Sequence, residues 1–291
     1  MNGDKIIVRL GGRLGNQMFQ YAAARALAMR LDLPLGVEGL APDSRHKSRV
    51  QILEAFRLDV PLHLMRKSRL EKWLLKLVRL GLPISLRGQR VFVEQGFRYD
   101  DRFELIAGGT YLVGGWVSPR YFDAIRPQLL KDFSFKGRLS DNATITKSSI
   151  LSNPCTIAAH VRRGDYVSDQ RTLERFGICE RDYYIAGIER VRKQYPDCHC
   201  YVFSDDVDMA QEELGDLQGM SFVRGNTQEE DLYLMSLCHH NIVANSTFSW
   251  WGAWLNEHPK KIVVAPKHWF GPKLADRYDT SDMIPAEWVR L

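Results

Sequence analysis

The stretch that decides the fold reads CTIAAHVRRGDY, at residues 155–166. Its first half is an apolar run typical of a buried strand, and its second half places two adjacent arginines, Arg162 and Arg163, where that strand ends. Two guanidinium groups are costly to remove from water unless an anion lies between them. A diphosphate fits, because the planar arginine fork donates paired hydrogen bonds to phosphate oxygens. The stretch therefore predicts a strand that ends at an anion-binding site.

The alternation of side chains along this strand predicts the directions in which the two arginines point. Alternating side chains face opposite ways, so His160 and Arg162 share one side and Arg163 takes the other, unless the strand has already ended. Gly164 indicates a turn at that point, which would let both arginines face one ligand. A structural ion pair between Arg163 and Asp165 is the alternative that the sequence leaves open.

Short β-rich runs alternate with helical ones along the chain, which predicts an α/β fold. The chain opens with the strand KIIVRL (5–10), a glycine-rich turn and an alanine-rich helix at 16–32. A polar segment at 136–154 ends in proline and indicates a domain boundary. We therefore expect one domain over residues 1–150 and a second over residues 151–291.

Two further polar clusters follow predicted strands of the second domain, SDDVD at 204–208 and NSTFS at 245–249. Ligands bind at the carboxyl ends of strands in open α/β sheets, so we expect these clusters to join the arginines at one site. Asp206 and Asp208 spell a DxD pattern, which holds a metal ion on a nucleotide diphosphate in many enzymes. Acidic residues here also cap a following helix, and we expect this capping role.

The composition limits the class of protein. With 291 residues, 45% hydrophobic and 26% charged, the chain is a folded globular one, long enough for two domains. No apolar stretch approaches the roughly 20 residues of a membrane span, and the N-terminus lacks the apolar core of a secretory signal, so we expect a cytoplasmic protein. Five cysteines without paired CxxC spacing argue against a disulfide framework and a zinc site, so we expect free thiols.

The net charge of +5 is concentrated in one segment. Residues 62–81 hold six Lys or Arg against one Glu, and leucines recur there with Trp73 at helical spacing. This pattern predicts a basic amphipathic helix, which either docks on its own domain or makes peripheral contact with an anionic membrane. The rest of the chain is neutral, so we do not expect a nucleic-acid partner.

Four motifs in a fixed order carry a resemblance to a known family. They are GGRLGNQMFQYA (11–22), HVRRGDY (160–166), FSDD (203–206) and NSTFSWWGAWL (245–255). Together they resemble the motif set of the alpha-1,2-fucosyltransferases, glycosyltransferase family 11, over nearly the whole chain. The first two also resemble protein O-fucosyltransferases and alpha-1,6-fucosyltransferases. The resemblance implies a GT-B type fold, in which two Rossmann-like domains have a cleft between them.

The resemblance also implies a reaction. L-Fucose would pass with inversion from GDP-β-L-fucose to the 2-hydroxyl of a galactose in an oligosaccharide acceptor, without a metal or another cofactor. Arginines would then stabilise the negative charge that grows on the departing diphosphate. Two alternatives stay open: a metal-dependent transferase that uses another nucleotide sugar through the DxD pattern, and a glycan- or nucleotide-binding module without catalysis.

Carried over position by position, the resemblance assigns roles to individual residues. Arg163 and Asp165 are the expected catalytic residues, with His160 and Arg162 at the donor's diphosphate. The other expected donor-binding residues are Arg13, Gly15, Asn16 and Gln17 in the first domain and Asp205, Ser246, Thr247 and Phe248 in the second. A general base would assist the acceptor hydroxyl, and the candidate carboxylates are Asp165, Asp169 and Glu94.

Overall fold

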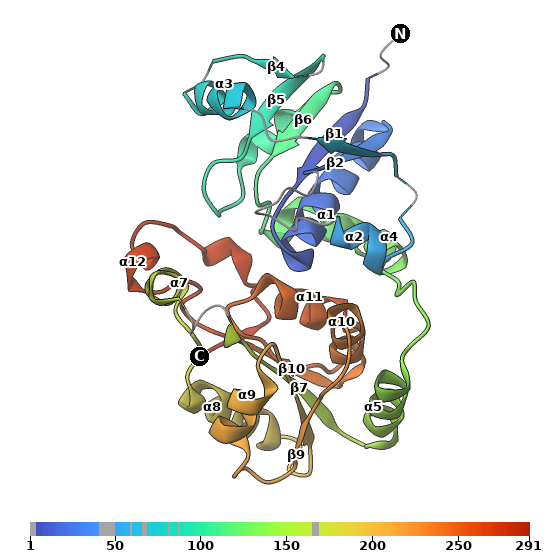
Figure 1. Ribbon diagram of the computed structural model, residues 1–291, viewed down its shortest axis with the longest axis vertical. Helices are drawn as coiled ribbons and strands as arrows, with labels where there is room; N and C mark the ends of the chain where they lie inside the picture. Colours follow the sequence, from blue (N-terminus) through green and yellow to red (C-terminus); the bar gives the residue numbers. More distant parts are fainter. Residues whose placement is uncertain are drawn as a thin grey trace. The chain divides into compact units, whose positions relative to one another are not determined.

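The computed structural model describes residues 4–40, 50–58, 60–65, 69–80, 82–86, 88–164 and 169–291. The chain divides into two compact units, each built on one six-stranded sheet (Figure 1). The first unit comprises Met1–Lys136 and Asp279–Met283, and the second comprises Gly137–Tyr278 and Ile284–Leu291. The predicted α/β class is confirmed.

The sheet of the first unit has the strand order β3-β2-β1-β6-β5-β4, and only the β4–β5 pair is antiparallel. Its strands are β1 (Ile6–Leu10), β2 (Leu35–Leu40), β3 (Leu62–Met65), β4 (Ser85–Leu86), β5 (Gln89–Val93) and β6 (Thr110–Val113). Its α-helices are α1 (Leu14–Leu31), α2 (Gln51–Ala55), α3 (Arg69–Arg79) and α4 (Arg126–Asp132). Its 3-10 helices are η1 (Asp101–Leu105), η2 (Pro119–Tyr121), η3 (Asp123–Ile125) and η4 (Ser281–Met283).

The sheet of the second unit has the strand order β12-β11-β10-β7-β8-β9, and its pairs are parallel. Its strands are β7 (Thr156–Val161), β8 (His199–Ser204), β9 (Met220–Phe222), β10 (His240–Ile242), β11 (Val263–Ala265) and β12 (Val289–Arg290). Its helices are α5 (Asp141–Ser152), α7 (Gln170–Phe176), α8 (Arg181–Arg192), α9 (Val207–Leu214), α10 (Gln228–Leu237), α11 (Thr247–Leu255) and α12 (Pro272–Ala275).

Strand β7 lies near the middle of this second sheet and is buried along its whole length. Ile157, Ala159 and Val161 pack in one core cluster with apolar side chains of α8 and α9. Figure 1 shows α8 and α9 on one face of the sheet and α10 and α11 on the other. Because side chains alternate along a strand, this packing decides which face His160 and the arginines after it can reach.

The boundary between the units falls at residues 136/137, at the start of the polar segment 136–154 that indicated it, whereas the expected domains met at residue 150. The polar segment that suggested a linker forms helix α5, which the Ser140 side chain caps by accepting a hydrogen bond from Ala143 N–H. The Ser140 N–H also donates to Glu230 in α10 at 2.6 Å. Since α5 is fixed to the second unit in this way, the boundary precedes it.

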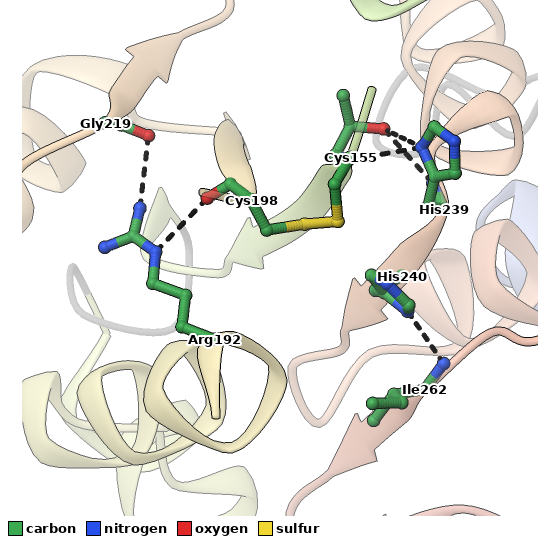
Figure 2. Close-up of a disulfide and its surroundings, with 8 residues drawn as sticks. Cys155, Arg192, Cys198, Gly219, His239, His240 and Ile262 are labelled. Atoms are coloured by element: carbon green, nitrogen blue, oxygen red, sulfur yellow. Dashed lines mark hydrogen bonds between the residues drawn. A yellow bond between two sulfur atoms is a disulfide. The ribbon is translucent and has the colours of Figure 1, made fainter. Parts of the chain in front are cut away.

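The expectation of free thiols is wrong for Cys155 and Cys198, which form a disulfide (Figure 2). The parallel register of β7 and β8 pairs Thr156 with His199, so the residues directly before them lie side by side. The two cysteines are 43 residues apart in the sequence, and no local spacing predicts their pairing. The other cysteines are free and buried: Cys179, Cys200 and Cys238.

The basic segment at 62–81 is described in part, as strand β3 and helix α3. Leu75 and Val78 of α3 pack against the apolar side chains of β5, so the helix docks on its own sheet. Trp73 stays 56% exposed and Leu80 stays 78% exposed. None of the described helices has the length and hydropathy that crossing a membrane requires.

Candidate active site

Arg162 lies directly after β7, at the carboxyl edge of the second sheet. Its Nη1 forms an ion pair with Asp205 Oδ2 at 2.9 Å, and its side chain is 12% exposed. Asp205 follows β8, the neighbouring parallel strand, and its Oδ1 accepts a hydrogen bond of 2.8 Å from the Arg163 backbone N–H. Two contacts therefore fix the carboxylate that positions the Arg162 guanidinium at this edge.

The Arg162–Asp205 ion pair requires a glycine at position 164. A Cβ atom at position 164 would lie 2.1 Å from Asp205 Oδ2, far inside van der Waals contact. Any side chain there would push Asp205 away from Arg162. The glycine that suggested a turn in the sequence thus provides space for the carboxylate.

The structure corrects the expected catalytic role of Arg163. Its side chain is 1% exposed, and its Nε and Nη2 bind the two carboxylate oxygens of Glu213 in α9 at 2.7 and 2.5 Å. Its remaining described bonds go to the backbone carbonyls of Cys179 and Arg162. Because these donors point to the α8–α9 side, Arg163 stabilises the fold and does not face a diphosphate. The predicted partner Asp165 lies outside the described residues.

His160 lies on the opposite face of β7 from Arg163, as the pleat predicts. Its ring centroid is 5.5 Å from that of Phe248 in α11, so the structure brings these two predicted site residues together. Burial and the nearby Arg162 charge lower the pKa of His160 to about 3. The ring is therefore neutral at physiological pH, and its Nδ1 has no hydrogen-bond partner among the described residues.

The amino end of α11 lies in the same region, because β10, which leads to it, pairs with β7. Ser246 caps this nine-residue helix without a side-chain cap bond, and its first turn carries no acidic residue. Such an end favours a bound anion through its backbone N–H groups and helix dipole. The Asn245 side chain does not serve the helix end. Its amide donates to the carbonyls of Phe176 and Gly177 and holds the chain at the end of α7.

The DxD carboxylates have other partners in the structure. Asp206 accepts a hydrogen bond from Met209 N–H and caps α9, which confirms the expected capping role. Asp208 is exposed and pairs with Arg224 at 2.8 Å. The geometry thus gives no support to a metal site formed by this motif.

Within the described ranges, one group of side chains places His, Cys or acidic ligand atoms close enough for a metal ion: Cys155, Cys198 and His240. It lies at the amino ends of β7, β8 and β10, the edge of the sheet opposite Arg162. Its sulfur atoms form the disulfide, and His240 Nδ1 accepts the Ile262 N–H (Figure 2). This group is therefore separate from the candidate active site.

The glycine-rich turn of the first unit leads directly into α1. Gln17 is buried, and its side chain donates to the Gly12 carbonyl at 3.1 Å and accepts from Ile52 N–H at 3.2 Å. Its expected donor contact is therefore corrected, because the amide holds the turn and α2 in place.

The other predicted residues of this turn differ in their exposure. Gly15 is buried in the first turn of α1, whereas Arg13 is exposed and Asn16 is half-buried. The Asn16 amide lies over Gly12, where a Cβ atom would come within 2.4 Å of it. Arg13 and Asn16 are thus the two predicted side chains of this turn that reach the surface.

The three candidate bases are placed very differently. Asp169 caps α7 by accepting hydrogen bonds from Arg171 N–H and the Thr172 hydroxyl. Asp165 lies outside the described residues. Glu94 is buried at the end of β5 in the first unit.

Motif reasoning missed a cavity of about 560 Å³ in the second unit. Its walls come from the segments around Phe176, Asn245 and Phe270. Lys267 and His268 are also part of the lining and follow β11 in the sequence. Asn245 belongs to the motif at 245–255, but the other walls come from segments far apart in the chain, so the sequence did not indicate a cavity.

Comparison with known proteins identifies the family. A model of "Glycosyl transferase family 11" matches residues 108–291. The chain belongs to glycosyl transferase family 11. Two curated relatives from Escherichia coli cover nearly all of it: an alpha-1,2-colitosyltransferase, 30% identical over 98% of both chains, and the O-antigen biosynthesis glycosyltransferase WbnK, 31% identical over 97% of this chain and 99% of the relative.

The family assignment makes this protein a glycosyltransferase. Among solved structures, the fucosyltransferase NodZ from Bradyrhizobium aligns with a TM-score of 0.55 at 12% identity, over 86% of this chain and 93% of that one. At this identity the likeness concerns the fold. It confirms the GT-B type architecture, with one parallel-rich sheet in each unit.

Proposed function

We propose that this family 11 glycosyltransferase is an inverting alpha-1,2-fucosyltransferase. It would transfer L-fucose from GDP-β-L-fucose to the 2-hydroxyl of a galactose in a glycan acceptor. The second unit would bind the donor, and the first unit would serve the acceptor. Donor contacts from Arg13 and Asn16 of the first unit stay predictions.

The observation that carries this proposal is the Arg162–Asp205 pair at the carboxyl edge of the second sheet. The bond to the diphosphate breaks during glycosyl transfer, and negative charge grows on the phosphate oxygens. A guanidinium held before the donor arrives stabilises that charge without reorganising during the reaction. Asp205 holds the Arg162 guanidinium in this way. The amino end of α11 lies nearby, because α11 follows β10, the strand that pairs with β7.

The remaining predicted donor residues fit the same region of the second unit. Thr247 and Phe248 open α11, and Ser246 precedes them. We propose that the neutral His160 ring, which packs on Phe248, forms one hydrogen bond with GDP-fucose. Asp205 positions Arg162, and its expected nucleoside contact stays a prediction.

A second donor sugar is favoured by one specific observation. The colitosyltransferase from Escherichia coli is 30% identical over nearly the whole chain. As its name states, that enzyme forms an alpha-1,2 linkage with colitose as the transferred sugar. An assay that offers activated fucose and activated colitose together, and measures which sugar is transferred to the acceptor, decides between these donors.

The test is transfer from GDP-fucose to lactose and N-acetyllactosamine in the presence of EDTA, with the linkage read by NMR. The proposal predicts a 2′-fucosylated product. Product only after manganese is restored would support the metal-dependent alternative. GDP binding without transfer from any activated sugar, fucose or colitose, would support a binding module and contradict the proposal.

We also propose that α3 makes peripheral contact with an anionic membrane. Its inner side chains pack on the sheet, while Trp73 and Lys76 of the helix and Leu80 directly after it are exposed at helical spacing. Aromatic and apolar side chains beside basic ones are typical of helices that bind at a membrane surface.

A further inference from the structure

Glu94 follows β5 directly and is 7% exposed. Its Oε2 accepts two backbone hydrogen bonds, from Gly115 N–H at 2.7 Å and from Trp116 N–H at 2.8 Å. Its Oε1 has no hydrogen-bond partner among the described residues. A buried carboxylate oxygen without a partner is uncommon in folded proteins, and its presence calls for a functional explanation.

The backbone around this carboxylate has an unusual shape. A Cβ atom on Gly114 would lie 2.6 Å from Glu94 Oε2, so backbone alone covers the carboxylate there. Trp116 has a φ of 56°, a left-handed conformation that is rare for a bulky side chain. Backbone strain of this kind gathers at functional sites, where the surrounding structure maintains it.

Hydrogen bonds connect this segment to the glycine-rich turn after β1. Gln20 accepts from Gly11 N–H at 2.8 Å and donates to the Gly114 carbonyl at 3.2 Å. β1, β5 and β6 are parallel neighbours, so their carboxyl ends meet at one edge of the first sheet. Glu94 and the glycine-rich turn therefore belong to one cluster in the first unit.

Burial gives the Glu94 carboxylate a high proton affinity. Burial raises the pKa of Glu94 to about 7, although the Trp116 and Gly115 N–H groups and the Tyr121 hydroxyl oppose the rise and Asp100 adds to it. Tyr121 itself accepts from Asp100 N–H at 2.8 Å. Arg102 pairs with Asp100.

We propose that Glu94 is the general base of the transfer reaction, an inference that rests on the proposed function. The O–H bond of the acceptor hydroxyl breaks, and its proton moves to Glu94 Oε1. The oxygen of that acceptor hydroxyl forms the bond to the sugar's anomeric carbon as the bond from that carbon to the phosphate oxygen breaks. The electron pair of that bond leaves on GDP, so charge and atoms balance. A purely structural Glu94 would only hold the Gly115–Trp116 backbone.

Glu94→Gln separates these two roles, because the amide oxygen still accepts the two backbone N–H groups while the side chain no longer takes a proton. We expect a fall of about 10²-fold or more in the kcat of transfer. The Kd for GDP and the unfolding midpoint should stay close to the wild-type values. Transfer at the wild-type rate by this variant would overturn the proposal.

The pH profile gives a readout that a structural role would not produce. The base acts only when it is ionised, so wild-type transfer should rise with pH through about 7 and then level off. Glu94→Gln should lose this rise. Asp231 of α10 also has a pKa raised to about 7, by burial, so Asp231→Asn is the matched control and should keep the wild-type profile. Loss of the rise in the control alone would overturn the assignment.

A second variant keeps the test valid if Glu94→Gln fails to fold. Glu94→Asp keeps an ionisable carboxylate but withdraws it by one methylene group from the proton that it accepts. Its kcat should fall below that of the wild type and stay above that of Glu94→Ala, with the rise of transfer with pH retained and GDP binding unchanged. Transfer by Glu94→Ala at the wild-type rate would contradict the proposal. An inactive wild type would instead contradict the proposed function itself.

Discussion

Arg162 and Arg163 directly follow β7, and their side chains continue the alternation of the strand to opposite sides of the sheet. Arg163 enters the α8–α9 side and pairs with Glu213, which lies 50 residues later in the sequence. Arg162 stays at the carboxyl edge with Asp205. The pleat argument was sufficient to predict this separation, whereas the turn at Gly164 suggested that both arginines would face the ligand.

Replacement of Arg163 should therefore affect stability. Arg163→Met removes a buried, bidentate ion pair and leaves the Glu213 carboxylate and two carbonyls without their donor. We expect a loss of about 3 kcal/mol in the free energy of unfolding, measured with urea. The exposed Arg224→Met is the matched control and should cost at most about 1 kcal/mol. Equal stability of both variants would contradict this role.

The hydrophobic periodicity of residues 62–81 predicted the amphipathic helix α3 correctly. The spacing of its leucines indicated an amphipathic helix, and the structure packs Leu75 and Val78 on the sheet. Periodicity did not reveal that Trp73 and Leu80 stay exposed, because exposure depends on how much of the helix the sheet covers.

The exposed face of α3 should bind anionic vesicles. We expect wild-type protein to sediment with vesicles that contain phosphatidylglycerol, and Trp73→Gln with Leu80→Gln to reduce the bound fraction several-fold, because apolar burial is lost. Leu105→Gln is the matched control, since Leu105 is 84% exposed on η1. Equal sedimentation of all three proteins would contradict a membrane role for this helix.

At the scale of the whole molecule, the α/β class and the convergence of polar clusters at strand ends were predictable, because both depend on local alternation and on general rules for parallel sheets. The polar segment at 136–154 indicated the boundary between the units, whereas its position within that segment was not predictable, since α5 acquires its place through Glu230 in a distant helix. The disulfide was also missed, because strand register and not sequence spacing brings Cys155 to Cys198.

The disulfide should contribute to the stability of the second unit without affecting catalysis. It closes a loop across 43 residues, so Cys155→Ala should lower the free energy of unfolding by about 2–4 kcal/mol. Reduction of the wild type should reproduce this loss. Transfer should persist at temperatures where the variant stays folded, because the disulfide lies at the sheet edge opposite Arg162. An unchanged unfolding midpoint after reduction would contradict the prediction.

Fucose transfer from GDP-fucose to lactose by the wild type and by Arg162→Ala, with EDTA present, tests whether Arg162 acts on the leaving diphosphate. We expect product from the wild type and a fall of about 10²- to 10³-fold in the variant, with an unchanged unfolding midpoint. Transfer by Arg162→Ala at the wild-type rate would contradict the assignment of this arginine to the leaving diphosphate.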